Sequence, residues 1–108
     1  MILPVQERGA TLEIAMMIGL VTASISIPDA RSLKDKRSVV KGLKDRIRNR
    51  MNVSVAEVGR QDEWKFCDLA FVTVSAESSV VQSRISEISE YLRGDPRYVL
   101  THLKTEML

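Results

Sequence analysis

The first strand and the first helix of the fold are defined by residues 18–50, IGLVTASISIPDARSLKDKRSVVKGLKDRIRNR. The spacing of apolar residues in this stretch changes at Pro28. Before Pro28, apolar and small polar residues alternate, which is typical of a strand with one covered face. The apolar face comprises Val21, Ala23, Ile25 and Ile27, and the opposite face comprises Thr22, Ser24 and Ser26. After Pro28 the apolar residues recur at helical spacing, so the chain turns from strand to helix there.

The helix is predicted to begin at Ser32 and to end near Met51. Ser32 is a favoured N-cap residue, and Asp35, three positions later, completes a capping box. The residues that recur at helical spacing are Leu33, Val40, Leu43 and Ile47. They form an apolar stripe, which we expect to pack against the sheet.

Four further elements follow along the chain. The pattern predicts strands at 52–58 and 68–75, a helix at 78–93 and a last strand at 97–107, in which Val99, Thr101, Leu103, Thr105 and Met107 alternate. With right-handed crossovers, the order β-α-β-β-α-β places two helices on one face of a four-stranded antiparallel sheet, the ferredoxin-like α+β arrangement. This domain is predicted over residues 16–108, and residues 1–15 form an N-terminal extension.

Positive charge is concentrated in the first helix. Residues 31–50 contain nine of the 16 Lys and Arg residues and two acids, a formal +7, whereas the rest of the chain carries seven bases and twelve acids. At 100° per residue, five cations fall within about 80° of one another; they are Lys34, Arg37, Lys41, Lys44 and Arg48. We call these five residues the basic stripe. Asp35 and Asp45 are expected on other sides of the helix, with Lys36 and Arg50 at the edge of the stripe.

The basic stripe has two interpretations. Charged helix faces commonly serve only to keep a protein soluble. Alternatively, the stripe contacts phosphate groups, and such contacts bind without reading sequence and weaken steeply with salt.

A polar loop after the second strand is the other candidate site, with Gln61, Asp62 and Trp64 as its partner-binding residues. A tryptophan in a loop often packs over the core as a lid, which is the interpretation that we favour here. Otherwise it offers a stacking platform for a base or an anchor for a protein partner. Glu57, at the end of the preceding strand, is expected to form a salt bridge to the basic helix.

Catalytic and cofactor motifs are poorly represented. The chain has one histidine, His102, and one cysteine, Cys67, without zinc-ligand spacing, and no glycine-rich phosphate loop. We therefore predict no catalytic residues, no metal and no cofactor. The chain contains neither an apolar run of membrane-spanning length nor a signal peptide, and its single cysteine suits a reducing compartment, so we expect a cytoplasmic protein that does not insert into membranes.

Three motifs resemble those of the YlxP-like proteins, the family called domain of unknown function 503. They are SLKDKR at residues 32–37, NVSVAEV at residues 52–58 and the QDEW loop at residues 61–64. The resemblance covers about residues 17–108. It implies a small bacterial cytoplasmic protein with a ferredoxin-like fold and a role related to RNA or the ribosome, and it brings no catalytic residues with it.

Two functional hypotheses follow. The first is non-catalytic binding to structured RNA or the ribosome through the basic stripe, with RNA favoured over DNA only by the resemblance. The alternative is a protein-interaction or homodimerisation module that uses the uncovered sheet face, where Thr22, Ser24 and Ser26 lie. The sheet itself is not expected to stack bases, because Phe71, its one aromatic residue on a central strand, is expected in the core.

Overall fold

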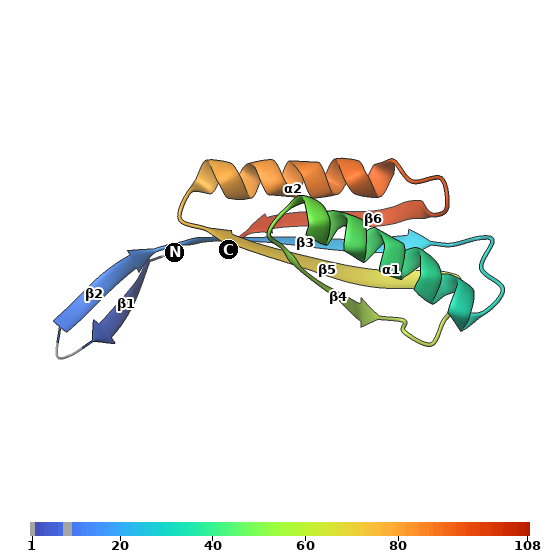
Figure 1. The fold of residues 1–108 in the computed structure, drawn as a ribbon, viewed down its shortest axis with the longest axis horizontal. Coiled ribbons are helices and arrows are strands. Elements are labelled where there is room, and N and C mark those ends of the chain that lie inside the picture. The colour runs from blue at the N-terminus through green and yellow to red at the C-terminus, as the bar shows by residue number, and fades with distance from the viewer. Residues whose placement is uncertain (1, 8–9) are drawn as a thin grey trace.

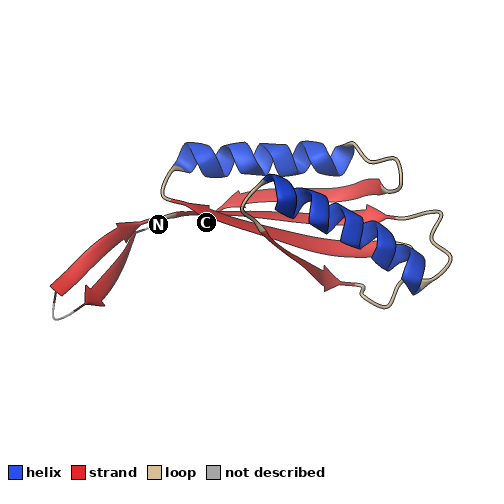
Figure 2. Ribbon diagram, in the orientation of Figure 1, coloured by secondary structure: helices blue, strands red, loops and turns tan. Residues whose placement is uncertain are grey.

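The computed structural model describes residues 2–7 and 10–108 (Figure 1). Its main domain has the order β3 (Met17–Ser26), α1 (Leu33–Arg50), β4 (Ser54–Gly59), β5 (Phe66–Ser75), α2 (Ser78–Arg93) and β6 (Val99–Met107). The four strands pair antiparallel in the order β4-β5-β3-β6. Both helices lie on one face of this sheet (Figure 2), which confirms the ferredoxin-like α+β fold.

The N-terminal segment forms a hairpin of its own. Strand β1 (Ile2–Glu7) pairs antiparallel with β2 (Ala10–Ala15), from Ile2 opposite Ala15 to Glu7 opposite Ala10. These two strands make a sheet separate from the four-stranded one. The hairpin projects beyond the end of the main domain (Figure 1).

The core lies between the helices and the sheet. The alternating residues of β3 are fully buried at Val21, Ala23 and Ile25, as the period of two requires. They meet the helical stripe of α1 and α2, which buries Val40, Leu43, Ile47, Val81, Ile88 and Leu92. Each large side chain removed from water in this way contributes about 1.5–3 kcal/mol before entropy is counted.

The N-terminus of α1 is capped as predicted, with one difference in detail. The Ser32 hydroxyl accepts a hydrogen bond from Asp35 N at 3.1 Å. The Asp35 carboxylate accepts from Arg31 N at 2.9 Å, one residue before the N-cap. The cap therefore satisfies two backbone donors and holds the entry of the chain into α1.

The last strand departs from strict alternation. A β-bulge at Thr101 shifts the register, so that Leu100 pairs with Ile25 and His102 pairs with Ser24. The Thr101 hydroxyl donates to Ser24 O at 3.0 Å and holds the bulge in place. Val99 consequently lies on the uncovered side of the sheet with 55% of its surface exposed, and the predicted alternation is wrong for this part of β6.

No helix in the described part of the chain is long and apolar enough to cross a membrane.

Candidate nucleic-acid interface

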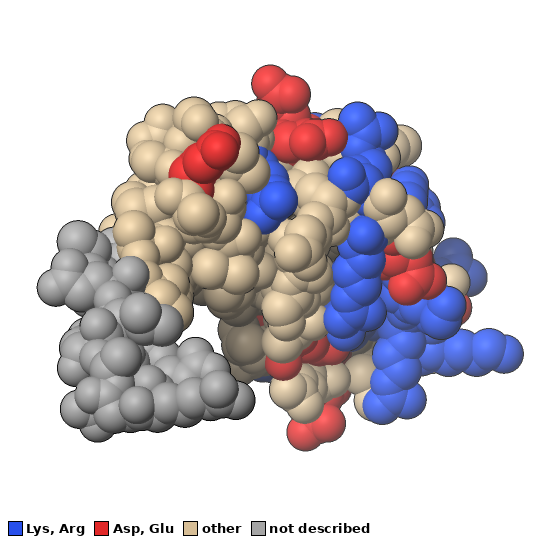
Figure 3. Space-filling view, turned by 60° about the vertical axis from the view of Figure 1, so that its left-hand side comes forward, with Lys and Arg blue, Asp and Glu red and all other residues tan. Residues whose placement is uncertain are grey.

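The basic stripe lies on the flank of α1 that faces the edge strand β4. Arg48 defines this orientation, because its Nη2 donates to Val55 O on β4 at 2.9 Å. Lys34, Arg37, Lys41 and Arg48 are exposed, and Lys44 is partly exposed. Figure 3 shows that Lys and Arg side chains gather on one side of the domain.

A smaller share of the cations is ion-paired in the basic stripe than in α1 as a whole. Lys41 pairs with Asp45 at 2.9 Å, so the expectation that Asp45 lies on another side is wrong. The hydrogen bond from Lys41 lowers the pKa of Asp45. Among the residues that the structure describes, no acid pairs with Lys34, Arg37 or Lys44. Arg48 donates to a carbonyl and pairs with no acid either, so Lys41 is the one stripe residue that an ion pair neutralises among the described residues.

Lys36 lies in the core and not at the edge of the stripe, which corrects the sequence-based expectation. Only 1% of its side chain is exposed, and its Nζ lies 2.8 Å from Glu57 Oε1. The same ammonium donates to Arg60 O at 2.7 Å and to Gln61 O at 3.3 Å. The predicted salt bridge from Glu57 to the basic helix is thus confirmed, and the three motifs quoted above meet at one buried charge.

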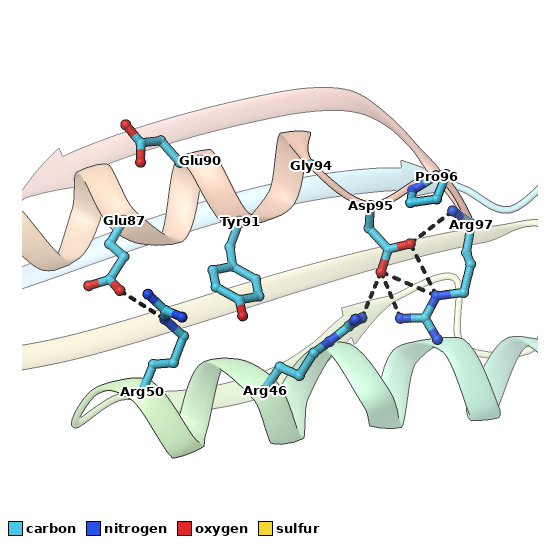
Figure 4. Close-up of a pocket in the computed structure, with 9 residues that line it drawn as sticks. All are labelled: Arg46, Arg50, Glu87, Glu90, Tyr91, Gly94, Asp95, Pro96 and Arg97. Carbon is cyan, nitrogen blue, oxygen red and sulfur yellow. Dashed lines mark hydrogen bonds and ion pairs between the residues drawn. The ribbon is translucent and has the colours of Figure 1, made fainter.

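The two arginines on the other flank of α1 face α2 and are compensated (Figure 4). Arg46 Nη2 lies 2.6 Å from Asp95 Oδ2, and Arg50 Nε lies 3.0 Å from Glu87 Oε1. Bonds from Arg97 and Arg46 hold the pKa of Asp95 well below its usual range.

These residues line a hollow of about 570 Å³ between the C-terminal halves of the helices. Its charged residues are Arg46, Arg50 and Arg97 against Glu87, Glu90 and Asp95. Equal numbers of bases and acids give this hollow no excess charge. The surplus charge of α1 therefore lies on the β4 side, where the stripe is.

The loop of residues 60–65, between β4 and β5, is fixed against the start of α1. Besides the two bonds from Lys36, Lys65 Nζ donates to Pro28 O and Ile27 N donates to Lys65 O, each at 2.7 Å. Arg60 begins the loop in the left-handed region, with φ of 54°. These contacts hold the loop in one conformation at the N-terminal end of the stripe.

Trp64 does not cover the core, and the lid interpretation is wrong. Half of its surface (50%) is exposed, and Gln61 and Asp62 beside it are exposed as well. The Gln61 amide donates to Glu57 O at 3.1 Å, so this residue also helps to hold the loop to β4. The structure thus places both candidate sites next to each other, joined by Lys36.

Sequence reasoning missed a third group beside the loop, formed by Arg60, Phe66 and Asp68. The Arg60 guanidinium lies 4.8 Å from the centre of the Phe66 ring and donates to both carboxylate oxygens of Asp68 at 2.8 and 3.1 Å. The hydrogen bonds that Arg60 donates to Asp68 lower the pKa of the carboxyl group, and the same bonds raise the pKa of the guanidinium. The three residues lie within nine positions of one another, but they form no recognised motif that would signal their contact.

Cys67 and His102 lie on opposite faces of the sheet. Cys67 is fully buried on the helix side, and burial raises its pKa to about 12. His102 is exposed and pairs with Ser24 of β3, whereas Cys67 pairs with the next residue of β3, Ile25. Successive residues of a strand point to opposite faces, so Cys67 and His102 do as well. Within residues 2–7 and 10–108, no group of three potential ligands is arranged to hold a metal ion.

Comparison with known proteins places the chain among relatives of unknown function. The model of the family described as "Protein of unknown function (DUF503)" matches residues 18–105. The uncharacterized protein YlxP of Bacillus subtilis (strain 168) is 32% identical over 90 residues, which make up 83% of this chain and 98% of that protein. The family model covers all but the first and last residues of the ferredoxin-like domain, together with both candidate sites, so the chain belongs to the DUF503 family.

Proposed function

We propose that this protein binds structured RNA or the ribosome without catalysing a reaction, and that the basic stripe is its contact surface. The observation that carries the proposal is the cluster of Lys34, Arg37 and Lys44, none of which pairs with an acid among the described residues. On a helix, cations three or four residues apart lie about 4.5–6 Å apart along the axis, so they can follow the phosphates of one nucleic-acid strand.

The absence of catalysis is part of the same proposal. A buried Cys67 with a pKa of about 12 remains a thiol at neutral pH, so it is a poor nucleophile. His102 cannot act as its base from the other face of the sheet. Both observations support a role in binding over a role in chemistry.

The experiment is sedimentation with purified ribosomal subunits at low and high salt. We expect co-sedimentation at low salt that falls as salt is added, because phosphate contacts release counterions. Arg37→Glu, alone and combined with Lys34→Glu and Lys44→Glu, should abolish it stepwise. Arg93→Glu is the matched control, since Arg93 is an exposed arginine at the end of the other helix. Equal loss in the control, or salt-independent association, would refute the proposal.

A second candidate function is homodimerisation through the uncovered sheet face, and one observation favours it. Val72 and Val74 expose 41% and 48% of their surface on this face. They pair with Leu20 and Ile18 of β3, so four apolar residues adjoin one another. Thr22, Ser24 and Ser26 continue the same face as partly exposed polar residues.

Sedimentation equilibrium separates this function from RNA binding. An apolar dimer persists at high salt, and Val72→Lys should dissociate it. Gln82→Lys, on the exposed side of α2, adds the same charge and should leave the dimer intact. A wild-type protein that stays monomeric at all concentrations would remove this candidate.

A further inference from the structure

Trp64 combines two properties that rarely occur together in a loop residue: its indole is half exposed, and the backbone that carries it is fixed. The exposed fraction is 50%. Lys36 of α1 donates hydrogen bonds to the carbonyls of Arg60 and Gln61, and Ile27, directly after β3, donates one to the carbonyl of Lys65. A fixed aromatic surface loses little conformational entropy when a planar partner stacks on it, so it is pre-organised for binding.

A second planar surface lies close to Trp64 in the chain. Phe66 is 38% exposed, and the Arg60 guanidinium lies over its ring at 4.8 Å. Asp68 holds this guanidinium through two hydrogen bonds. Aromatic rings and arginine planes are the two kinds of protein surface on which unpaired bases stack.

The loop that carries Trp64 adjoins the start of the basic stripe, whereas Phe66 and Asp68 lie on the uncovered face of the sheet, opposite Ser26 and Ser24. Lys36 bonds to the first two residues of the loop, and Lys34 and Arg37 lie in the same first turn of α1. Neither of these two cations pairs with an acid among the described residues. A strand whose base reached Trp64 would therefore find cations for its neighbouring phosphates.

We infer that this site takes an unpaired nucleotide of an RNA single strand or loop, with its base stacked on Trp64 and the adjoining phosphates on Lys34 and Arg37. The inference rests on the proposed function and narrows it. A duplex hides the faces of its bases inside the stack, so a duplex could use only the stripe. A single strand uses the stripe and the stacking surface together.

The experiment uses the intrinsic fluorescence of the full chain, in which Trp64 is the sole tryptophan. The probes are a 12-nucleotide mixed-sequence RNA, the same RNA annealed to its complement, and inorganic polyphosphate of similar charge. We expect the single strand to quench Trp64 fluorescence on binding. Polyphosphate and duplex should compete for the stripe, measured by displacement of a labelled strand, without quenching Trp64.

Substitutions test the same point by affinity. Trp64→Ala should weaken binding of the single strand about fivefold to a hundredfold, the range for loss of one stacked base. The same substitution should leave polyphosphate binding unchanged, and Trp64→Phe should restore most of the affinity for the single strand. Val58→Ala, at another exposed apolar residue, is the control for surface truncation.

The outcomes distinguish this inference from the proposed function. Equal affinity for single strand and duplex, with no quenching and no effect of Trp64→Ala, overturns the inference and leaves the stripe as an RNA surface, with Trp64 free to anchor a protein. Failure to bind any of the three probes contradicts both.

Discussion

Replacing Lys36 with methionine removes a buried ammonium group while keeping a side chain of similar length. The group holds together three elements, because it contacts Glu57 on β4 and the carbonyls of Arg60 and Gln61 in the loop. In the native protein 19% of the Glu57 side chain is exposed, and the substitution leaves its carboxylate without the cation now beside it. The carbonyls of the loop also lose their charged donor.

The size of the effect follows from this geometry. Removing one partner of a buried ion pair costs about 3–5 kcal/mol, because the other charge remains desolvated. Glu57 is partly in contact with water, so we expect the lower end, about 3 kcal/mol. A domain of this size has roughly 5–15 kcal/mol of stability. The loss should lower the midpoint of thermal unfolding by about 10–20 °C.

Urea unfolding of Lys36→Met and two companion proteins measures this effect. Lys34→Met changes the same charge two residues away on the exposed side of α1 and should alter the free energy of unfolding by less than about 0.5 kcal/mol. Adding Glu57→Gln to Lys36→Met removes the orphaned charge and should recover at least about 1 kcal/mol. If Lys36→Met proved as stable as Lys34→Met, the buried charge would not be holding the loop to α1.

Four further predictions concern two glycines, one cysteine and one aspartate. Gly42→Ala should stabilise the protein by about 0.5–1 kcal/mol in urea unfolding, because a Cβ there would lie 3.5 Å from Arg97 Nη1 without a clash. Gly19→Ala should destabilise it by about 1–3 kcal/mol, because its Cβ would lie 2.6 Å from Val81 Cγ1. With a pKa of about 12, Cys67 should react with iodoacetamide at pH 8 at least about a hundredfold more slowly in the native protein than in urea, and comparable rates would contradict its burial. Asp95→Asn should cost about 1–2 kcal/mol at pH 7. The folded pKa of Asp95 lies well below its ordinary 3.8, so the unfolded chain takes up the proton first as the pH falls. The difference from wild type should therefore be constant above about pH 5 and shrink below about pH 4; a pH-independent difference would contradict this.

Local periodicity was sufficient to predict the helices and strands of the domain and their order along the chain. The switch at Pro28, the cap at Ser32 and the period of two in β3 are all properties of neighbouring residues. The bulge in β6 was not predictable in this way, because it depends on how Thr101 meets Ser24, a residue far away in the chain.

The candidate site was predicted in part, and its errors have specific physical causes. Lys36 precedes Leu43 by two helical turns, so helical spacing alone would place it on the buried face. The expectation went the other way because charged side chains are rarely buried. Asp45 lies one turn after Lys41 and pairs with it for the same geometric reason. The anchoring of the Trp64 loop depends on carbonyl contacts between segments distant in sequence, and no local pattern encodes those.

The central claim is that RNA contacts the flank of α1 that faces β4 together with the adjoining loop. Its most direct test is to titrate the ¹⁵N-labelled protein with the 12-nucleotide single strand and follow the backbone amide shifts by NMR. We expect the shifts to concentrate in residues 33–48 and 60–66 and to diminish as salt is added. Shifts confined to the uncovered sheet face around Val72 and Val74, or to the hollow between the helices around Tyr91, would contradict the account.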